Sequence, residues 1–259
     1  MFYLGTHRPN WLGLTDVPLF VSHRTIKDRK TFPKAKGRWA LDSGAFTEIS
    51  KYGKWVTTED EYVEAVARYE AEIGGMDWAA PMDWMCEPHM IELTGLSVAE
   101  HQHRTIENYL AIRGRGPFIP VLQGWEPQDY MAHVAAYADA GIDLSLEPTV
   151  GVGSVCRRQA TAELVEIMRL IREAGISSHG FGVKAAGIHK CGDYMKSADS
   201  MAWSFTARYS PPMAGHTHKT CANCLEYALK WRQQLVGGAM LRELPGLVKR
   251  GSAWVKEAV

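Results

Sequence analysis

Short apolar runs alternate with longer amphipathic stretches along most of this chain, and this alternation restricts its fold more than any other feature. The apolar runs expected to form strands are Phe2–Gly5, Leu19–Ser22, Arg38–Asp42, Asp77–Met82, Phe118–Gln123, Ile142–Leu146, Gly180–Lys184 and Ala198–Trp203. Several lack polar alternation, which is typical of parallel strands buried on both faces. Eight such strands in 259 residues predict an α/β fold, namely a TIM-like (β/α)₈ barrel in a single domain over residues 1–259.

The stretches between these strands carry the start and stop signals of helices. Helices are expected over Thr58–Ile73, Ser97–Arg113, Pro127–Ala140 and Ala160–Ala174. Ser97 stands three residues before Glu100, which is a capping-box pattern, and glycine follows the last two predicted helices. A doubly wound open sheet is the alternative, because the first two crossovers are short. No G-x-G-x-x-G follows the first strand, however, so the main motif of a dinucleotide-binding sheet is missing.

Polar residues stand where the predicted strands end, and this is where barrel enzymes carry their chemistry. They are His7, His23, Asp42, Asp83, Gln123, Glu147, Lys184 and Asp199. Any one of them can be explained by the ordinary gathering of polar residues where strands meet loops. A carboxylate that ends a buried apolar strand nevertheless needs a partner or a ligand. Asp42, Asp83 and Asp199 together therefore indicate a site.

Glycines accompany three of these strand ends. Gly44 follows Asp42-Ser43 and lets the backbone approach a ligand closely. Gln123 stands beside Gly124 and offers an amide that both donates and accepts. The loop Gly151-Val-Gly153 could cradle a phosphate or present amides to a flat ring, although two glycines in a loop are often only turns.

Four metal donors lie within nine residues near the C-terminus. His216, His218, Cys221 and Cys224 have the spacing H-x-H-x₂-C-x₂-C. Imidazole and thiolate donors at these spacings suit a closed, tetrahedral structural Zn²⁺ site. We therefore expect a small zinc-binding segment over residues 213–237. A redox Cys-x-x-Cys is the alternative, and the paired histidines make it less natural.

The balance of charge limits how the chain can bind a polyanion. Lys plus Arg and Asp plus Glu both number 29, so the net charge is zero and nucleic-acid contacts must use a local basic surface. The clearest one runs from Thr25 to Arg38, with six cations against Asp28. We expect it on the catalytic face, contacting phosphates; a solvated loop is the alternative.

The sequence also bears on the compartment. No apolar run approaches the length needed to span a bilayer, and the first residues do not read as a signal peptide. Five cysteines are too few for a disulfide scaffold. A cytoplasmic location is therefore expected, with no membrane partner.

Five short motifs, in order along roughly residues 1–235, resemble those of the tRNA-guanine transglycosylases. Leu41-Asp42-Ser43-Gly44-Ala45-Phe46 is similar to their Asp-Ser-Gly-Gly-Phe motif, Asp83-Trp-Met-Cys86 to their Asp-Glu-Cys motif, and Val121-Leu122-Gln123-Gly124 to their Val-Gln-Gly motif. Gly151-Val-Gly153 falls where their glycine-rich base-binding loop lies, and Asp199 where their nucleophilic aspartate lies. The metal-donor cluster follows, as it does in that family.

Two features differ from the tRNA enzymes and resemble the DNA-modifying branch of the family, the 7-deazapurine DNA transglycosylases of phages and bacterial modification islands. The chain is shorter than the tRNA enzymes, and its zinc-donor spacing differs from their C-x-C-x₂-C with a distant His. His7-Arg-Pro-Asn-Trp11 also looks like that branch. The resemblance implies exchange of guanine in DNA for a 7-deazaguanine, such as the 7-cyano form.

The resemblance also implies roles for individual residues. Asp199 would be the nucleophile and Asp42 the general acid/base. The substrate-binding set would be Asp83, Gln123, Gly124, Gly151, Gly153, Ser43, Gly44, Phe46 and Lys184. The implied partners are DNA with a flipped guanine nucleotide and the free 7-deazaguanine base. The implied location is the cytoplasm of a bacterium or of a phage-infected host. The sequence does not decide whether the protein forms a homodimer or needs helper proteins. The alternatives are the same exchange on tRNA, a non-catalytic nucleic-acid-binding barrel, and a barrel hydrolase with a catalytic metal.

Overall fold

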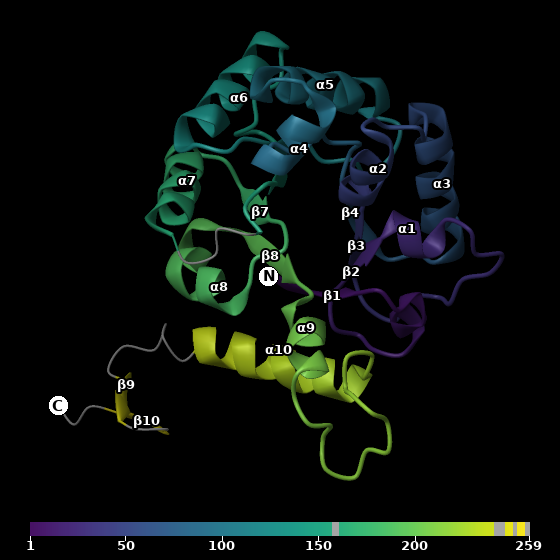
Figure 1. The fold of residues 1–259 in the computed structure, drawn as a ribbon, viewed down its shortest axis with the longest axis vertical. Coiled ribbons are helices and arrows are strands. Elements are labelled where there is room, and N and C mark those ends of the chain that lie inside the picture. The colour runs from purple at the N-terminus through teal and green to yellow at the C-terminus, as the bar shows by residue number, and fades with distance from the viewer. Residues whose placement is uncertain (157–160, 241–246, 251–252, 257–259) are drawn as a thin grey trace. The chain divides into compact units, whose positions relative to one another are not determined.

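The computed structural model describes residues 1–156, 161–240, 247–250 and 253–256, which belong to two compact units, Met1–Met201 and Ala202–Val259. In the first unit, eight parallel strands form one curled sheet in the order β4-β3-β2-β1-β8-β7-β6-β5 (Figure 1). They are β1 (Phe2–Thr6), β2 (Leu19–Ser22), β3 (Trp39–Asp42), β4 (Met76–Ala79), β5 (Val121–Leu122), β6 (Val150–Val152), β7 (Ser178–Gly180) and β8 (Ser197–Ser200). A parallel bridge between Ala79 and Phe118 brings the two edges of the sheet together. The predicted α/β, TIM-like class is confirmed.

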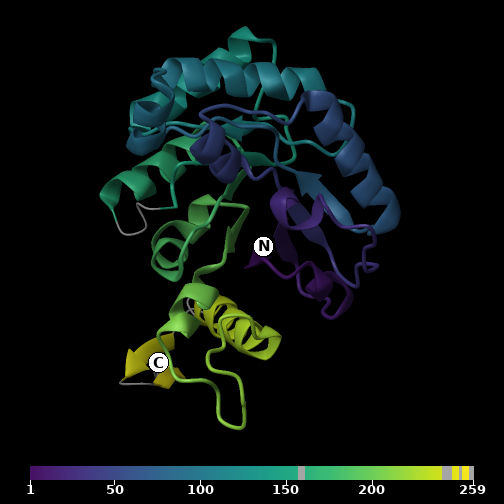
Figure 2. The ribbon, with the colours of Figure 1, turned by 45° about the vertical axis from the view of Figure 1, so that its right-hand side comes forward.

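Helices cover the outside of this sheet, as Figures 1 and 2 show for α3, α5, α6 and α7. The helices of the first unit are α1 (His23–Ile26), α2 (Ala45–Tyr52), α3 (Glu59–Glu72), α4 (Pro88–Thr94), α5 (Val98–Ile112), α6 (Pro127–Asp139), α7 (Ala162–Glu173) and α8 (Ala185–Cys191), with 3₁₀ turns η1 (Pro9–Gly13) and η2 (Gly192–Tyr194). The four predicted helices are confirmed as α3, α5, α6 and α7, although Ala160 lies outside the described residues. The Ser97 hydroxyl accepts the Glu100 N–H at 3.2 Å, so the cap read from the sequence is present.

Aromatic side chains dominate one core cluster of the strand region. Tyr3, Trp78 and Ile119 pack together, with Phe20 and Phe181 against them. These residues come from β1, β2, β4 and the segments beside β5 and β7, so the cluster joins both halves of the sheet.

Three of the predicted strands are wrong in position. The sixth strand is Val150–Val152, not Ile142–Leu146. Ile142 and Leu144 are buried, which explains their apolar pattern, but the Asp143 carboxylate accepts the Ser145 N–H at 2.9 Å and closes a turn there. Strand seven is Ser178–Gly180, and strand eight ends at Ser200 because helix α9 (Ala202–Arg208) begins immediately afterwards.

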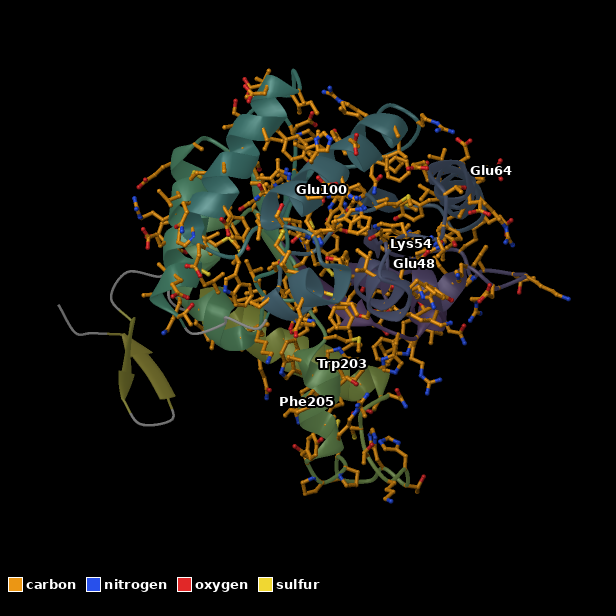
Figure 3. The ribbon with its side chains drawn as sticks, turned by 45° about the horizontal axis from the view of Figure 1, so that its top comes forward. Glu48, Lys54, Glu64, Glu100, Trp203 and Phe205 are labelled. Atoms are coloured by element: carbon orange, nitrogen blue, oxygen red, sulfur yellow. The ribbon has the colours of Figure 1, made fainter. Side chains whose placement is uncertain are left out.

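The second unit is mainly helical. It contains α9, α10 (Leu225–Met240) and an antiparallel pair, β9 (Leu247–Arg250) with β10 (Ala253–Lys256). On α9, Trp203 is buried whereas Phe205 is exposed (Figure 3). The loop after α9 is tied to it because the Ser204 hydroxyl donates to the Ala222 carbonyl at 2.8 Å. Among the described residues, no helix has the length and apolar content that crossing a membrane requires.

Candidate active site and metal centre

A cavity of about 310 Å³ opens at the carboxyl ends of the strands in the first unit. Each of the eight strands contributes a wall residue from its own carboxyl end or from the position just after it. The volume is at the lower end of the range for small-molecule sites, roughly 300–1,000 Å³, and suits a ligand the size of a nucleobase. Active sites of TIM-like barrels lie at this face.

Asp83 is buried and is held by two neighbouring strand ends. Its Oδ1 accepts the Ser43 hydroxyl at 3.2 Å, and its Oδ2 accepts the Gln123 side-chain amide at 2.5 Å. Burial, together with the negative charge of Asp42, raises the pKa of Asp83 to about 7. Near neutral pH this carboxyl group is therefore able either to accept or to donate a hydrogen bond.

Ser154 extends this network on the same wall of the cavity. Its hydroxyl accepts the Cys86 N–H at 2.8 Å and lies 2.7 Å from Gln123 Oε1 and 2.9 Å from Glu87 Oε2. Ser154 has a φ of +55°, a conformation that non-glycine residues adopt rarely and that clusters at functional sites. Ser154 and the buried Glu87 were not among the site residues predicted from the sequence, although Ser154 belongs to the glycine-rich loop and Glu87 directly follows Cys86.

Asp42 ends β3 and faces the same cavity. The Ser22 side chain and the Gly44 N–H lie close enough to its carboxylate to favour the charged form and so act to lower its pKa. Burial raises the pKa of Asp42, and the negative charge of Asp199 adds to this effect. Gly44 has a φ of +83°, and a Cβ there would overlap the Arg24 side chain, so glycine is required at this turn.

Asp199 lies in β8 and is 5% exposed, at the cavity wall. Its Oδ1 accepts the Gly182 N–H at 2.8 Å, and His179 Nε2 lies 3.4 Å from the same oxygen. The three carboxylates predicted from the sequence thus share one cavity. His179 was not predicted from the sequence because it lies within strand β7, whereas the predicted site residues stand at strand ends.

The other predicted substrate-binding residues divide into two groups. Phe46 and Gly153 line the cavity, and Ser43 reaches it through Asp83. Gly124, Gly151 and Lys184 are not part of the described wall. Gly124 packs against Tyr130 and Gly151 against the Phe181 ring, while Lys184 is an exposed N-cap of α8.

The remaining strand-end residues lie away from the cavity wall. His23 is buried between Tyr62 and Tyr69, where burial lowers its pKa to about 4, and its Nδ1 lies 3.0 Å from the Tyr69 hydroxyl. Glu147 precedes β6 because that strand begins later than predicted, and it pairs with Arg113 at 3.1 Å. His7 follows β1 without lining the cavity.

The basic stretch does not lie wholly on the catalytic face, contrary to the prediction. Arg38 directly precedes β3, which places it at the amino ends of the strands, where it pairs with Asp77 at 2.6 Å. Lys34 donates to the Ala71 carbonyl at 3.1 Å, near the C-terminal end of α3. The segment crosses from one end of the strands to the other, because a parallel crossover must return to the start of the next strand.

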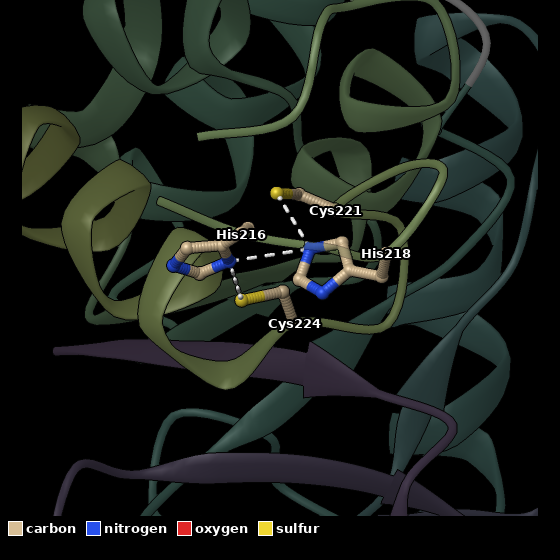
Figure 4. A group of neighbouring side chains, drawn as sticks. All are labelled: His216, His218, Cys221 and Cys224. Atoms are coloured by element: carbon tan, nitrogen blue, oxygen red, sulfur yellow. Dashed lines mark hydrogen bonds between the residues drawn. The ribbon is translucent and has the colours of Figure 1, made fainter. Parts of the chain in front are cut away.

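The four predicted metal donors come together in the second unit (Figure 4). His216 Nδ1 lies 3.2 Å from His218 Nε2 and 3.7 Å from Cys224 Sγ, and His218 Nε2 lies 3.1 Å from Cys221 Sγ. A tetrahedral zinc with ordinary bond lengths places its donors about 3.3–3.8 Å apart. The four donor atoms lie within 4.8 Å of one another, so a small inward shift would close the shell around an ion. Glu226 Oε2 lies 3.1 Å from His216 Nε2, as an outer carboxylate that orients a ligating imidazole does. This group can hold a metal ion such as zinc.

The family model described as DpdA, DeoxyPurine in DNA protein A, matches residues 1–257. The chain belongs to the DpdA family. This family is linked to 7-deazapurine modification of DNA of the DNA-guanine transglycosylase type, and it implies DNA as the substrate. No curated protein shows a significant match.

The raised pKa of Asp83 gives this DpdA-family chain a pH-dependent stability. The native state binds the Asp83 proton more tightly than the unfolded chain, whose carboxyl has its ordinary pKa of 3.8. The contribution of this proton to stability is therefore full below about pH 4 and is lost as the pH rises through about 7. Asp83→Asn, which cannot ionise, should gain stability relative to the wild type by about 1 kcal/mol or more between pH 4 and pH 8.

Denaturant unfolding of both proteins across this pH range measures the difference. Glu64→Gln is the matched control, because Glu64 lies exposed on the outer face of α3 (Figure 3) and its removal should leave the pH profile unchanged. A constant difference between wild type and Asp83→Asn would contradict the assignment.

Proposed function

We propose that this protein is a DNA-guanine transglycosylase, which exchanges guanine in DNA for a 7-deazaguanine through a covalent intermediate on Asp199. The observation that carries the proposal is one nucleobase-sized cavity holding Asp42, Asp83 and Asp199 in a chain of the DpdA family. The target nucleotide would leave the base stack to reach the cavity, as is usual for enzymes that act on a base.

In the first half-reaction, Asp199 attacks C1′ of the deoxyribose. The C1′–N9 bond breaks, and its electron pair leaves with guanine. Asp42 donates its proton to the departing base, which leaves as neutral guanine, while the sugar stays bound to Asp199 as an ester. The raised pKa of Asp42 suits it to hold that proton, whereas Asp199, which accepts the Gly182 N–H, supplies the attacking oxygen.

In the second half-reaction, the incoming 7-deazaguanine attacks C1′ through N9. Asp42, now a carboxylate, takes the N9 proton, and the C1′–oxygen bond to Asp199 breaks. Both carboxylates return to their starting state, so the exchange needs no other reactant. Splitting one displacement into two is the advantage of a covalent nucleophile.

Base recognition would rest on Asp83 and Gln123. Their side chains are already joined by a hydrogen bond, and Gln102 Nε2 donates to the Gln123 carbonyl at 2.7 Å, so both are fixed before a base arrives. Guanine and 7-deazaguanine present the same hydrogen-bond donors and acceptor on the pyrimidine ring, so Asp83 and Gln123 together can bind either base.

A structural Zn²⁺ would be held by His216, His218, Cys221 and Cys224. It would cross-link the loop between α9 and α10 and leave no open position for a substrate, because four protein donors complete a tetrahedral shell.

The proposal is tested by incubating the protein with labelled 7-cyano-7-deazaguanine and either duplex DNA or tRNA. We expect label in DNA and release of one guanine for each base incorporated. Label confined to tRNA would favour the tRNA alternative, and guanine release without incorporation would indicate a hydrolase.

Gly153→Ala should weaken binding of the free base by about 10- to 100-fold. A Cβ at this position would overlap the Gln123 side-chain amide, which must then leave its hydrogen bond with Asp83. Calorimetric titration with 7-deazaguanine measures the loss. The control is Gly192→Ala, because a Cβ there meets only Ile188 at an ordinary 3.8 Å. Unchanged affinity in Gly153→Ala would remove Gln123 from base recognition.

A further inference from the structure

His179 is completely buried and touches the carboxylate proposed as nucleophile. Its Nε2 lies 3.4 Å from Asp199 Oδ1, and its Nδ1 lies 2.8 Å from the Ser197 hydroxyl oxygen. All three residues lie on the adjacent strands β7 and β8, so the backbone pairing of two strands sets their spacing.

The environment of the ring keeps it uncharged. The rings of Tyr3, Phe20, Trp78 and Phe181 surround it at centroid distances of 4.7–5.7 Å. Burial among these apolar groups lowers the pKa of His179, although Asp199 acts in the opposite direction. The imidazole therefore carries a single N–H proton at neutral pH.

The chemistry of the two partners places that proton. An ionised carboxylate only accepts hydrogen bonds, so the contact with Asp199 requires the proton on Nε2. Nδ1 is then an acceptor, and the Ser197 hydroxyl donates to it. The Asp199 carboxylate thus selects this tautomer, because a hydroxyl group can pair with either one, and the Ser197 hydroxyl stabilises it by donating to Nδ1.

The two oxygens of Asp199 consequently differ. Oδ1 receives both the Gly182 N–H and His179 Nε2, whereas Oδ2 has no hydrogen bond within the described part of the chain. A carboxylate held by two donors at one oxygen keeps a fixed plane and presents the other oxygen. The contact of 3.4 Å is long for a hydrogen bond, and catalytic hydrogen bonds commonly shorten when substrate binds.

We propose that His179 is a positioning residue, which, as the Nε2–H tautomer supported by the Ser197 hydroxyl at Nδ1, holds Asp199 so that Oδ2 is the atom that attacks C1′. This inference rests on the proposed function, because it assigns the geometry of the proposed nucleophile. A neutral donor orients the carboxylate without cancelling its charge, so the nucleophile stays reactive.

Three variants test the inference. His179→Leu removes the donor, and His179→Gln restores one near the position of Nε2 through its side-chain amide. Ser197→Ala removes the hydrogen bond that holds the ring at Nδ1. The measurement is the rate of covalent adduct formation with DNA, with kcat and KM for the 7-deazaguanine determined separately. We expect His179→Leu to lower the rate and kcat by about 10- to 100-fold, with KM within about twofold of the wild type. His179→Gln should recover most of the loss, and Ser197→Ala should lower the rate by about 3- to 10-fold.

Thermal unfolding of each variant separates positioning from packing. A role in packing alone predicts that rate and stability fall together and that Gln gives no rescue. That result, or an unchanged kcat in His179→Leu, overturns the inference. Should His179→Leu fail to fold, the decision falls to the other two variants: a wild-type rate in folded Ser197→Ala, or loss of adduct in folded His179→Gln, overturns it. Absence of any adduct or exchange in the wild-type protein would instead refute the proposed function.

Discussion

Asp199→Asn should abolish the covalent protein–DNA species and lower base exchange by about 1,000-fold or more. The amide is nearly the same size as the carboxylate and can still fill its place beside Gly182 and His179, but it lacks the charge needed to attack C1′. Denaturing electrophoresis of enzyme mixed with DNA, with and without the 7-deazaguanine acceptor, measures the adduct directly.

Two further variants make this result specific. Asp42→Asn should also lower turnover, because it cannot carry the proton between half-reactions, yet it should still bind the base. Asp193→Asn is the matched control. Asp193 stands six residues before Asp199 in the sequence and is exposed, so this substitution should leave both measurements unchanged. If Asp199→Asn still forms a denaturation-resistant adduct while Asp42→Asn does not, the two roles are reversed.

Removal of the metal donors should unfold the loop between α9 and α10. Cys221→Ser should lose the bound zinc, because its sulfur is one of four donors that lie within 4.8 Å of one another. Cys221 is also buried against Ala207 and Ala222, so loss of the ion also loosens this small apolar cluster. Zinc binding contributes about 10–16 kcal/mol in zinc-finger peptides, far more than so few apolar contacts can replace.

Elemental analysis and limited proteolysis of the full chain measure this effect. One zinc per chain is expected in the wild type, together with rapid cleavage near residues 213–224 in Cys221→Ser or after chelation. Cys191→Ser serves as the control, because Cys191 is buried at the end of α8 and offers no donor to the cluster. Wild-type protein that contains no zinc when purified without chelator would contradict the structural role.

Residues of the cavity wall were predicted correctly where a polar residue stands at the end of a clear apolar run. Asp42 ends one buried strand and Asp83 follows another, and parallel strands bring their carboxyl ends to one edge, so sequence order alone placed them together. The same reasoning misplaced Glu147. Ile142 and Leu144 are apolar because they pack beneath a turn, and periodicity does not separate a buried turn from a short strand.

Local sequence by itself determined the four helices α3, α5, α6 and α7, the fold class and the metal-donor group. Caps such as Ser97, glycine stops and donors within nine residues act over short distances, so the information lies in adjacent residues. Only the tertiary structure decided what surrounds each catalytic candidate. Asp83 and Gln123 are 40 residues apart, and Ser154 is a further 31 residues along the chain. His179 reaches Asp199 only because β7 pairs with β8, and the burial that raises the pKa of Asp83 arises from side chains gathered from all parts of the first unit. Such contacts depend on strand order and packing, which no local pattern encodes.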